Sequence, residues 1–212
     1  MRLDAVVYTV AGMAFGVILG WVIGSQQLGR TASVPAAAPV QQSAAPASGQ
    51  AGGRQAPPLD QARVDQLTAT VNNDPKNTTA VVQLANVYFD AERFTDAVHW
   101  YEEAVKINPR DVNASTDLGI SYYYTNQPDR ALAQFDHSLA IDPKHSKTLL
   151  NVGIVRAFGK QDLEGAAKAF QQVLDVAPGS AEARAARQAL DGIRSAHPDL
   201  PGGAAKQPGA PN

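Results

Sequence analysis

Apolar side chains recur at helical spacing through the middle of the chain, between residues 59 and 195. Leu84 and Tyr88 share one face of a first segment, and Ala97 and Tyr101 share one face of the next. Apolar residues that return after three or four positions are typical of amphipathic helices. Short segments containing Asn, Asp, Pro or Gly separate these runs, and their prolines cannot continue a helix. The pattern predicts an all-α fold of short antiparallel helices without strands.

The same pattern occurs three times. Residues 78–111 align with residues 112–145 after a shift of 34 positions, and a third copy occupies residues 146–179. The third copy carries one extra residue, which is most simply placed in the turn around Gly159–Gly165, and it has Arg156 where the others have Tyr. The matched positions of the first two copies are Leu84-Ala85 and Leu118-Gly119, Tyr88 and Tyr122, Ala97 and Ala131, Tyr101 and Phe135, and Pro109 and Pro143.

The tetratricopeptide repeat has this order of residues at this spacing: Leu with Gly or Ala, then Tyr, then Ala, an aromatic residue and Pro. Over the three copies the chain resembles that family, and the resemblance implies an α-solenoid of stacked antiparallel helix pairs. Amphipathic segments at 59–73 and 180–195 are expected to form capping helices, because the ends of such a stack need a polar outer face. The expected repeat domain therefore spans residues 59–195.

The resemblance also implies a concave groove, lined by fixed positions of the first helix of each repeat. The residues at these positions are Val82, Asn86, Phe89, Asn113, Thr116, Ile120, Tyr123, Tyr124, Lys147, Leu150 and Phe158. Aromatic side chains bury a large area with few rotatable bonds, which suits the binding of a peptide. For any one apolar position the alternative is packing against a neighbouring repeat. Tyr123 and Tyr124 are the strongest groove candidates, because Tyr122 already supplies the core position of that copy.

One subgroup of the family grips the C-terminal carboxylate of a peptide with a set of Lys, Asn and Arg side chains. Asn86 and Lys147 match that set, whereas Val82, Asp117 and Asn151 depart from it. The departures remove one Lys and the Arg and introduce an acid. The sequence therefore argues against binding of a C-terminal carboxylate.

Residues 5–24 contain no charged side chain, and twenty helical residues span ~30 Å, the hydrocarbon thickness of a bilayer. Tyr8 and Trp21 lie near the two ends, where aromatic rings favour the membrane interface. We interpret residues 1–30 as an N-terminal membrane anchor with a transmembrane helix. The alternative is a cleaved signal peptide, which has a shorter apolar core. Charges flanking the span leave its orientation nearly undecided by the positive-inside rule.

Four glycines within this span recur at every fourth position: Gly12, Gly16, Gly20 and Gly24. Small residues at this spacing share one helix face and allow two membrane helices to approach closely. Homo-oligomerisation through this glycine face is therefore one hypothesis, and the alternative is ordinary glycine enrichment in membrane helices. Residues 31–58 are rich in Ala and Pro and are expected to form a disordered linker, and residues 196–212 a disordered tail.

The amino-acid composition limits the functions that the chain can have. Lys and Arg total 18 and Asp and Glu total 20, so the chain lacks the basic surplus expected of a nucleic-acid-binding protein. The absence of Cys excludes disulfides and thiolate metal sites, and the four His are scattered. No Gly-rich phosphate-binding loop follows a strand. We therefore expect no enzymatic activity, catalytic residue, metal site or cofactor.

The order of anchor, linker and repeats favours a membrane-tethered scaffold or adaptor that binds a protein or peptide partner in its groove. This layout is similar to bacterial inner-membrane tetratricopeptide proteins that assist envelope complexes, such as cytochrome c maturation factors and translocon subunits. By that resemblance the repeats are expected in the periplasm. The alternative is a structural envelope spacer that self-associates and has no dedicated peptide ligand.

Overall fold

The computed structural model describes residues 56–199, and every regular element in that range is helical. The helices are α2 (Gln61–Asn73), α3 (Thr78–Asp90), α4 (Phe94–Ile107), α5 (Val112–Tyr124), α6 (Pro128–Ile141), α7 (Ser146–Ile154), the π-helical turn η2 (Val155–Gly159), α8 (Leu163–Val176) and α9 (Ala181–Ala196). The predicted all-α class is confirmed for this part of the chain.

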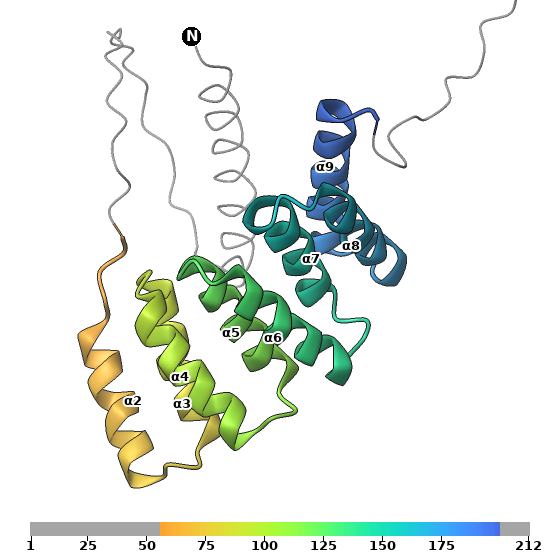
Figure 1. The fold of residues 1–212 in the computed structure, drawn as a ribbon. Coiled ribbons are helices and arrows are strands. Elements are labelled where there is room, and N and C mark those ends of the chain that lie inside the picture. Colours follow the sequence, from red (N-terminus) through yellow and green to blue (C-terminus); the bar gives the residue numbers. More distant parts are fainter. Residues whose placement is uncertain (1–55, 200–212) are drawn as a thin grey trace, which may run out of the picture. The chain divides into compact units, whose positions relative to one another are not determined.

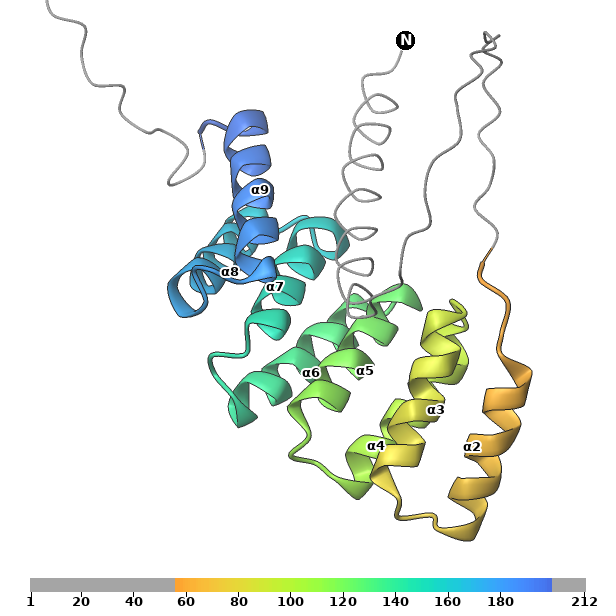
Figure 2. The same ribbon diagram turned by 180° about the vertical axis from the view of Figure 1, so that it is seen from behind.

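The helices form three successive hairpins that stack in chain order (Figures 1 and 2). Each repeat contributes one hairpin: α3 with α4, α5 with α6, and α7 with α8. Helix α2 packs on α3 at one end, and α9 packs on α7 and α8 at the other. Each hairpin therefore buries its apolar face against its neighbours, as expected of a solenoid.

Side-chain caps explain where many of these helices begin. The side chains that accept a hydrogen bond from a backbone N–H of the first turn belong to Asp60, Asn77, Asp111, Asp162 and Ser180. Each cap satisfies a donor that the helix itself leaves without a partner. Helix α6 begins instead with Pro128, whose missing N–H costs nothing in the first turn.

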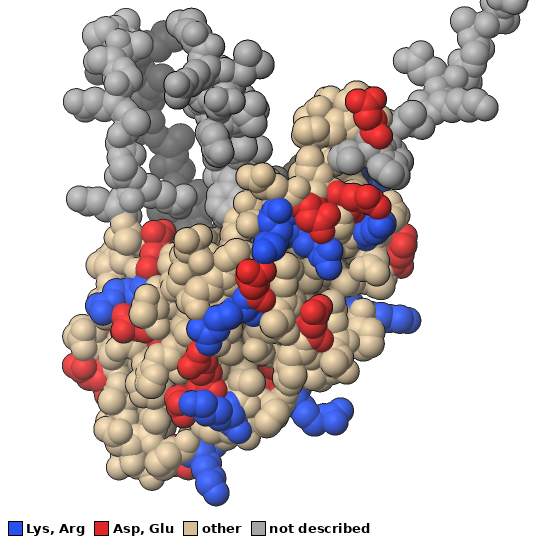
Figure 3. All heavy atoms as spheres, viewed as in Figure 1, with Lys and Arg blue, Asp and Glu red and all other residues tan. Residues whose placement is uncertain are grey.

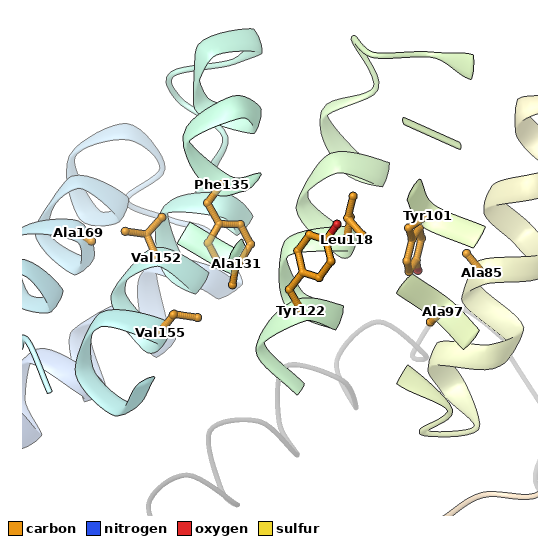
Figure 4. Close-up of a cluster of buried hydrophobic side chains, with 10 residues drawn as sticks. All are labelled: Ala85, Ala97, Tyr101, Leu118, Tyr122, Ala131, Phe135, Val152, Val155 and Ala169. Carbon is orange, nitrogen blue, oxygen red and sulfur yellow. The ribbon is translucent and has the colours of Figure 1, made fainter. Parts of the chain in front are cut away.

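The interior follows the repeated small and aromatic positions. Ala97, Ala131 and Ala166 of the second helices are fully buried, and their small side chains let the paired helices lie close. The ring positions one turn further along these helices, Tyr101 and Phe135 among them, are also buried. Figure 4 shows Ala97, Tyr101, Ala131 and Phe135 among the core side chains that follow one another through successive hairpins.

Two glycines make room for the buried rings. A Cβ atom placed on Gly119 would lie 2.7 Å from Cδ1 of Phe135 and still closer to Cε1. A Cβ atom on Gly153 would meet Phe170 of the third repeat in the same way. The small residue that the spacing predicted at this position is therefore required by the ring of the paired helix.

The third repeat holds its extra residue inside its first helix. The first helices begin at 78, 112 and 146, whereas the second helices begin at 94, 128 and 163. The turns between them keep the same length, and each contains one residue with positive φ, namely Glu92, Asn126 and Gln161. The extra residue is absorbed by η2, as a π-helical turn allows. This corrects its expected position in the turn around Gly159–Gly165.

The end helices show apolar inner sides and polar outer sides. Helix α2 buries Val64 and Leu67 and exposes Asp65 and Gln66, and the last helix buries Leu190 in the same manner. Within residues 56–199 no helix has the length and apolarity needed to cross a bilayer. The expected span at residues 5–24, its glycine face, most of the linker and residues 200–212 lie outside the described residues.

Candidate functional site

The candidate groove residues lie on the first helices of the three repeats, namely α3, α5, and α7 with its continuation η2. We call the surface that these elements form the first-helix face. Asn86 and Asn113 are exposed, and Phe158 is 37% exposed. Six further residues are half-buried: Val82, Phe89, Ile120, Tyr123, Tyr124 and Lys147. These nine residues present at least part of a side chain to a partner.

The two remaining candidates do not. Thr116 is 0% exposed and Leu150 is 1% exposed, so both pack inside the stack. This burial corrects the expectation that they line a groove. Leu150 lies within α7, whose residues from Thr148 to Ile154 are all buried. The cause for Thr116 is a polar contact between repeats.

The Thr116 hydroxyl belongs to a chain of hydrogen bonds that links α5 to α7. It donates to the carbonyl oxygen of Val112 at 2.7 Å, and its oxygen lies 2.7 Å from Oγ1 of Thr148. Nδ1 of His145 lies 2.7 Å from the same Thr148 oxygen. The hydroxyls of Thr116 and Thr148 each donate one hydrogen bond and accept one when Nδ1 of His145 carries the hydrogen. Burial holds the pKa of His145 below its usual value, which favours this neutral ring.

Four aromatic rings gather where α3, α4 and α5 meet, and we call Phe89, Phe94, Tyr123 and Tyr124 the aromatic patch. The rings of Phe94 and Tyr124 are stacked with centroids 4.2 Å apart. Phe89 meets both edge-on, at 5.3 Å from Phe94 and 5.9 Å from Tyr124. Tyr123 lies 6.1 Å from Tyr124. All four rings are half-buried, so the patch remains partly open to solvent.

Phe94 is the member that the sequence reasoning missed. It opens the second helix of its repeat, whereas the family positions transferred to this chain all lie on first helices. The helical spacing within α3 gives no sign of it. A signal that could have found it is the presence of a large ring directly after the tight turn between α3 and α4, next to Phe89 in the fold.

Hydrogen bonds and burial fix the surroundings of the patch. The Tyr101 hydroxyl donates to Oδ1 of Asn86 at 2.6 Å, which holds the exposed amide beside Phe89. Burial, the neighbouring Tyr123 hydroxyl and the charge of Glu92 raise the pKa of Tyr124 to about 12. Its phenol is therefore neutral at pH 7 and available as a hydrogen-bond donor.

Charged groups border the patch. Lys147 of α7 donates to Oδ1 of Asp117 on α5 at 2.6 Å, with both side chains about a quarter exposed. Burial raises the pKa of Asp117, and the Lys147 charge opposes that shift. Burial and the Asp117 charge also raise the pKa of Asp90. The lysine that matched the carboxylate-binding set is thus already engaged by an acid of the same chain.

The composition of the aromatic patch is that of a surface that recognises a polypeptide. Among residues 56–199 no group of three His, Cys, Asp or Glu side chains could hold a metal ion. Aromatic rings beside hydrogen-bonding groups are the usual composition of a protein-binding hot spot. On the face of the molecule seen in Figure 3, acidic and basic side chains are interspersed.

Together the hairpins define a class of protein, the α-solenoid built from 34-residue helix pairs. Residues 77–144 match the family model described as "Tetratricopeptide repeat". Residues 77–144 are therefore tetratricopeptide repeats, which confirms over that range the resemblance drawn from the sequence.

Curated relatives match parts of this chain. The human protein O-mannosyl-transferase TMTC3 is 24% identical over 119 residues, which make up 56% of this chain and 13% of that protein. The Drosophila grimshawi protein adenylyltransferase Fic is 30% identical over 88 residues, 42% of this chain and 18% of that protein. The chain thus spans only a small part of these relatives.

Solved structures share the fold. A crystal structure of MamA has a TM-score of 0.58 at 17% identity and covers 64% of this chain and 77% of its own. The first tetratricopeptide repeat domain of Spaghetti (RPAP3), bound to the HSP90 peptide SRMEEVD, has a TM-score of 0.53 at 22% identity and covers 59% of this chain and 97% of its own.

Proposed function

We propose that this protein is a scaffold that binds a protein partner at the aromatic patch on its first-helix face. The observation that carries the proposal is the presence of four half-buried rings from three helices, in contact with one another but partly open. Tyr101, Tyr122 and Phe135 fill the core positions, and Phe89 and Tyr123 pack against that core with part of each side chain still exposed. Large rings held rigidly at a surface are the side chains that contribute most to protein interfaces.

A solved relative supports the same mode of use. The RPAP3 domain carries a bound HSP90 peptide on the same fold. A peptide is therefore an occupant that this architecture accommodates. The proposed role requires no catalytic activity from this chain.

We further propose that residues 5–24 tether the scaffold to a membrane and that the linker allows the repeats to reach their partner. The support is the apolar sequence of that segment and the Ala- and Pro-rich stretch that follows it. A bacterial inner membrane with the repeats in the periplasm, and a role in assembling an envelope complex, fit this layout.

Site-specific crosslinking tests the scaffold proposal. A photoreactive phenylalanine analogue placed at Tyr124 of the full chain in native membranes is expected to crosslink to one other protein. The same analogue at Gln172, an exposed residue of α8, provides the control position. Crosslinking equally strong from both positions would contradict the proposal. Crosslinks only to a second copy of this chain would favour the self-associating spacer.

The double variant Tyr123→Ala with Tyr124→Ala supplies the loss-of-function arm. We expect it to recover much less partner in a pull-down from detergent-solubilised membranes, because it removes half of the patch. Far-ultraviolet circular dichroism checks that the helices remain folded. Undiminished recovery with a folded variant would refute the assignment of the binding site.

A further inference from the structure

The charges around the aromatic patch indicate which peptide it accepts. Two carboxylates flank the patch in the chain: Asp90 ends α3 directly after Phe89, and Glu92 lies in the turn between Phe89 and Phe94, its backbone N–H donating to the Phe89 carbonyl oxygen at 2.9 Å. Asp117 of α5 adds a third negative charge near Asp90. Loss of solvent around the Asp90 carboxyl and the charge of Asp117 both raise the pKa of Asp90. An acidic border favours a cationic ligand and repels an anionic one.

The cations near this surface are already used within the chain. Lys147 binds Asp117 at 2.6 Å, Arg156 binds Asp162 at 2.8 Å, and Lys160 of the following turn binds Asp129 at 2.6 Å. Across the described residues, α3 and α5 carry no Lys or Arg at all. The first-helix face therefore has no cation left for a carboxylate of a partner.

The acidic side chains beside the patch, unlike these cations, are not all paired with an opposite charge. Among the ion pairs of residues 56–199, none includes Asp90 or Glu92. The nearby basic side chain of the same turn, Arg93, binds Asp96 at 2.8 Å. Asp90 is exposed, but the removal of some surrounding solvent and the nearby Asp117 charge raise its pKa, so without a cation its charge is costly to the folded protein. A cation delivered by a ligand would remove that cost.

The rings complement a basic side chain in a second way. Faces of Phe and Tyr attract Arg and Lys, and the aliphatic stem of a basic residue packs on apolar rings. Glu92 lies in the tight turn between Phe89 and Phe94, where its backbone N–H donates to the carbonyl oxygen of Phe89 at 2.9 Å. A stem that packs on these two rings can therefore bring its charged end to the carboxylates at the end of α3 and in this turn. An apolar neighbour in the same peptide would then cover Phe94 and Tyr124.

We propose, on the basis of the scaffold function above, that the partner contributes an internal peptide segment in which Arg or Lys stands next to a large apolar residue. The basic group binds at Asp90 and Glu92, and the apolar side chain binds on the aromatic patch. In this mode the protein supplies the carboxylates and the peptide supplies the cation. Lys147 cannot bind a peptide carboxylate, because it is already paired with Asp117.

Fluorescence anisotropy with the full chain in mild detergent tests this assignment with three labelled peptides. One is the end-blocked peptide GSLRFSG, one is the same peptide with Glu in place of Arg, and one is SRMEEVD with a free C-terminus. We expect GSLRFSG to bind at least about tenfold more tightly than either acidic peptide, because like charges oppose the latter at the patch. Equal binding of the Arg and Glu peptides would overturn the proposal.

Two matched variants locate the charge. Asp90→Asn is expected to weaken GSLRFSG binding about fivefold, the effect of one partly exposed ion pair. Asp136→Asn makes the same charge change at an exposed residue of α6 and should leave the affinity unaltered. Weakening by both variants to the same extent would reduce the effect to net charge and refute a site at Asp90.

A third variant tests the engaged lysine. Asp117→Asn frees Lys147, so SRMEEVD should bind this variant more tightly than the wild type. No gain would contradict the claim that Asp117 excludes carboxylates. If no peptide binds while crosslinking from Tyr124 still captures one partner, the cationic assignment is wrong and the scaffold function stands. If crosslinking fails as well, the scaffold function itself is refuted.

Discussion

Replacement of Gly119 by Ala tests whether the glycines of the first helices are required by the rings they face. Gly119 lies in the interior of α5, opposite Phe135 of α6. The added methyl group would lie 2.7 Å from Cδ1 of that ring, closer than real Cβ atoms approach a neighbour. Phe135 is 0% exposed and is enclosed by adjacent hairpins, so the ring cannot swing aside.

Two opposing contributions determine how much Gly119→Ala changes the free energy of unfolding. Ala in a helix interior is favoured over Gly by about 1 kcal/mol. Overpacking of a filled core costs about 1–3 kcal/mol, and a conflict with an immobile ring belongs in the upper part of that range. We therefore expect Gly119→Ala to lower the free energy of unfolding by about 1–2 kcal/mol.

Urea unfolding of the full chain, followed by circular dichroism at 222 nm, measures this change. Gly192→Ala is the matched control, because Gly192 lies in the interior of α9 and a Cβ there has no neighbour within 4 Å. The control should gain up to about 1 kcal/mol from helix propensity alone. If Gly119→Ala also becomes more stable, the steric reasoning fails. Adding Phe135→Leu to Gly119→Ala should recover part of the loss.

Three further outcomes follow from the contacts described. Thr116→Val should destabilise the domain by about 1–2 kcal/mol in urea unfolding, because it breaks the hydrogen bonds of the Thr116 hydroxyl. Thr79→Val, at an exposed position, should leave the stability nearly unchanged, and equal effects of the two variants would contradict this expectation. The ion pair between Arg130 and Glu102 is partly exposed, so a double-mutant cycle of Arg130→Met with Glu102→Gln should give a coupling below about 1 kcal/mol. A coupling well above that value would contradict this expectation. Asp90→Asn should stabilise the domain at pH 7, because a carboxyl whose pKa is raised on folding opposes folding once it is ionised. This gain in the free energy of unfolding should vanish below pH 3.8, the usual pKa of Asp, and a gain that persists there would refute the electrostatic cause.

The sequence predicted the hairpins because each depends on residues that recur at fixed spacing. The Leu84, Ala97 and Tyr101 positions define the paired faces, and the proline after each second helix marks its end. Caps such as Asp111 and Ser180 could also be identified, because their chemistry acts within one helical turn. Local rules of this kind do not depend on how neighbouring repeats dock.

The features that the sequence did not predict depend on contacts between repeats. Thr116 and Leu150 were expected at a surface, but their burial is set by the way α7 lies against α5 and α8. Phe94 joins the aromatic patch only because the turn after α3 brings the next helix back beside Phe89. The extra residue of the third repeat was counted correctly, but periodicity alone does not distinguish a longer turn from η2.

The contacts between the second and third repeats also limit how this array can evolve. Repeat proteins lengthen when a unit is duplicated, and a new unit fits wherever its neighbours present only generic apolar surface. Here Thr116 requires Thr148, and Asp117 requires Lys147, across a single junction. A unit without these residues, inserted between the two repeats, would leave both halves of each pair without their counterpart, so the addition of such a unit is favoured elsewhere along the stack.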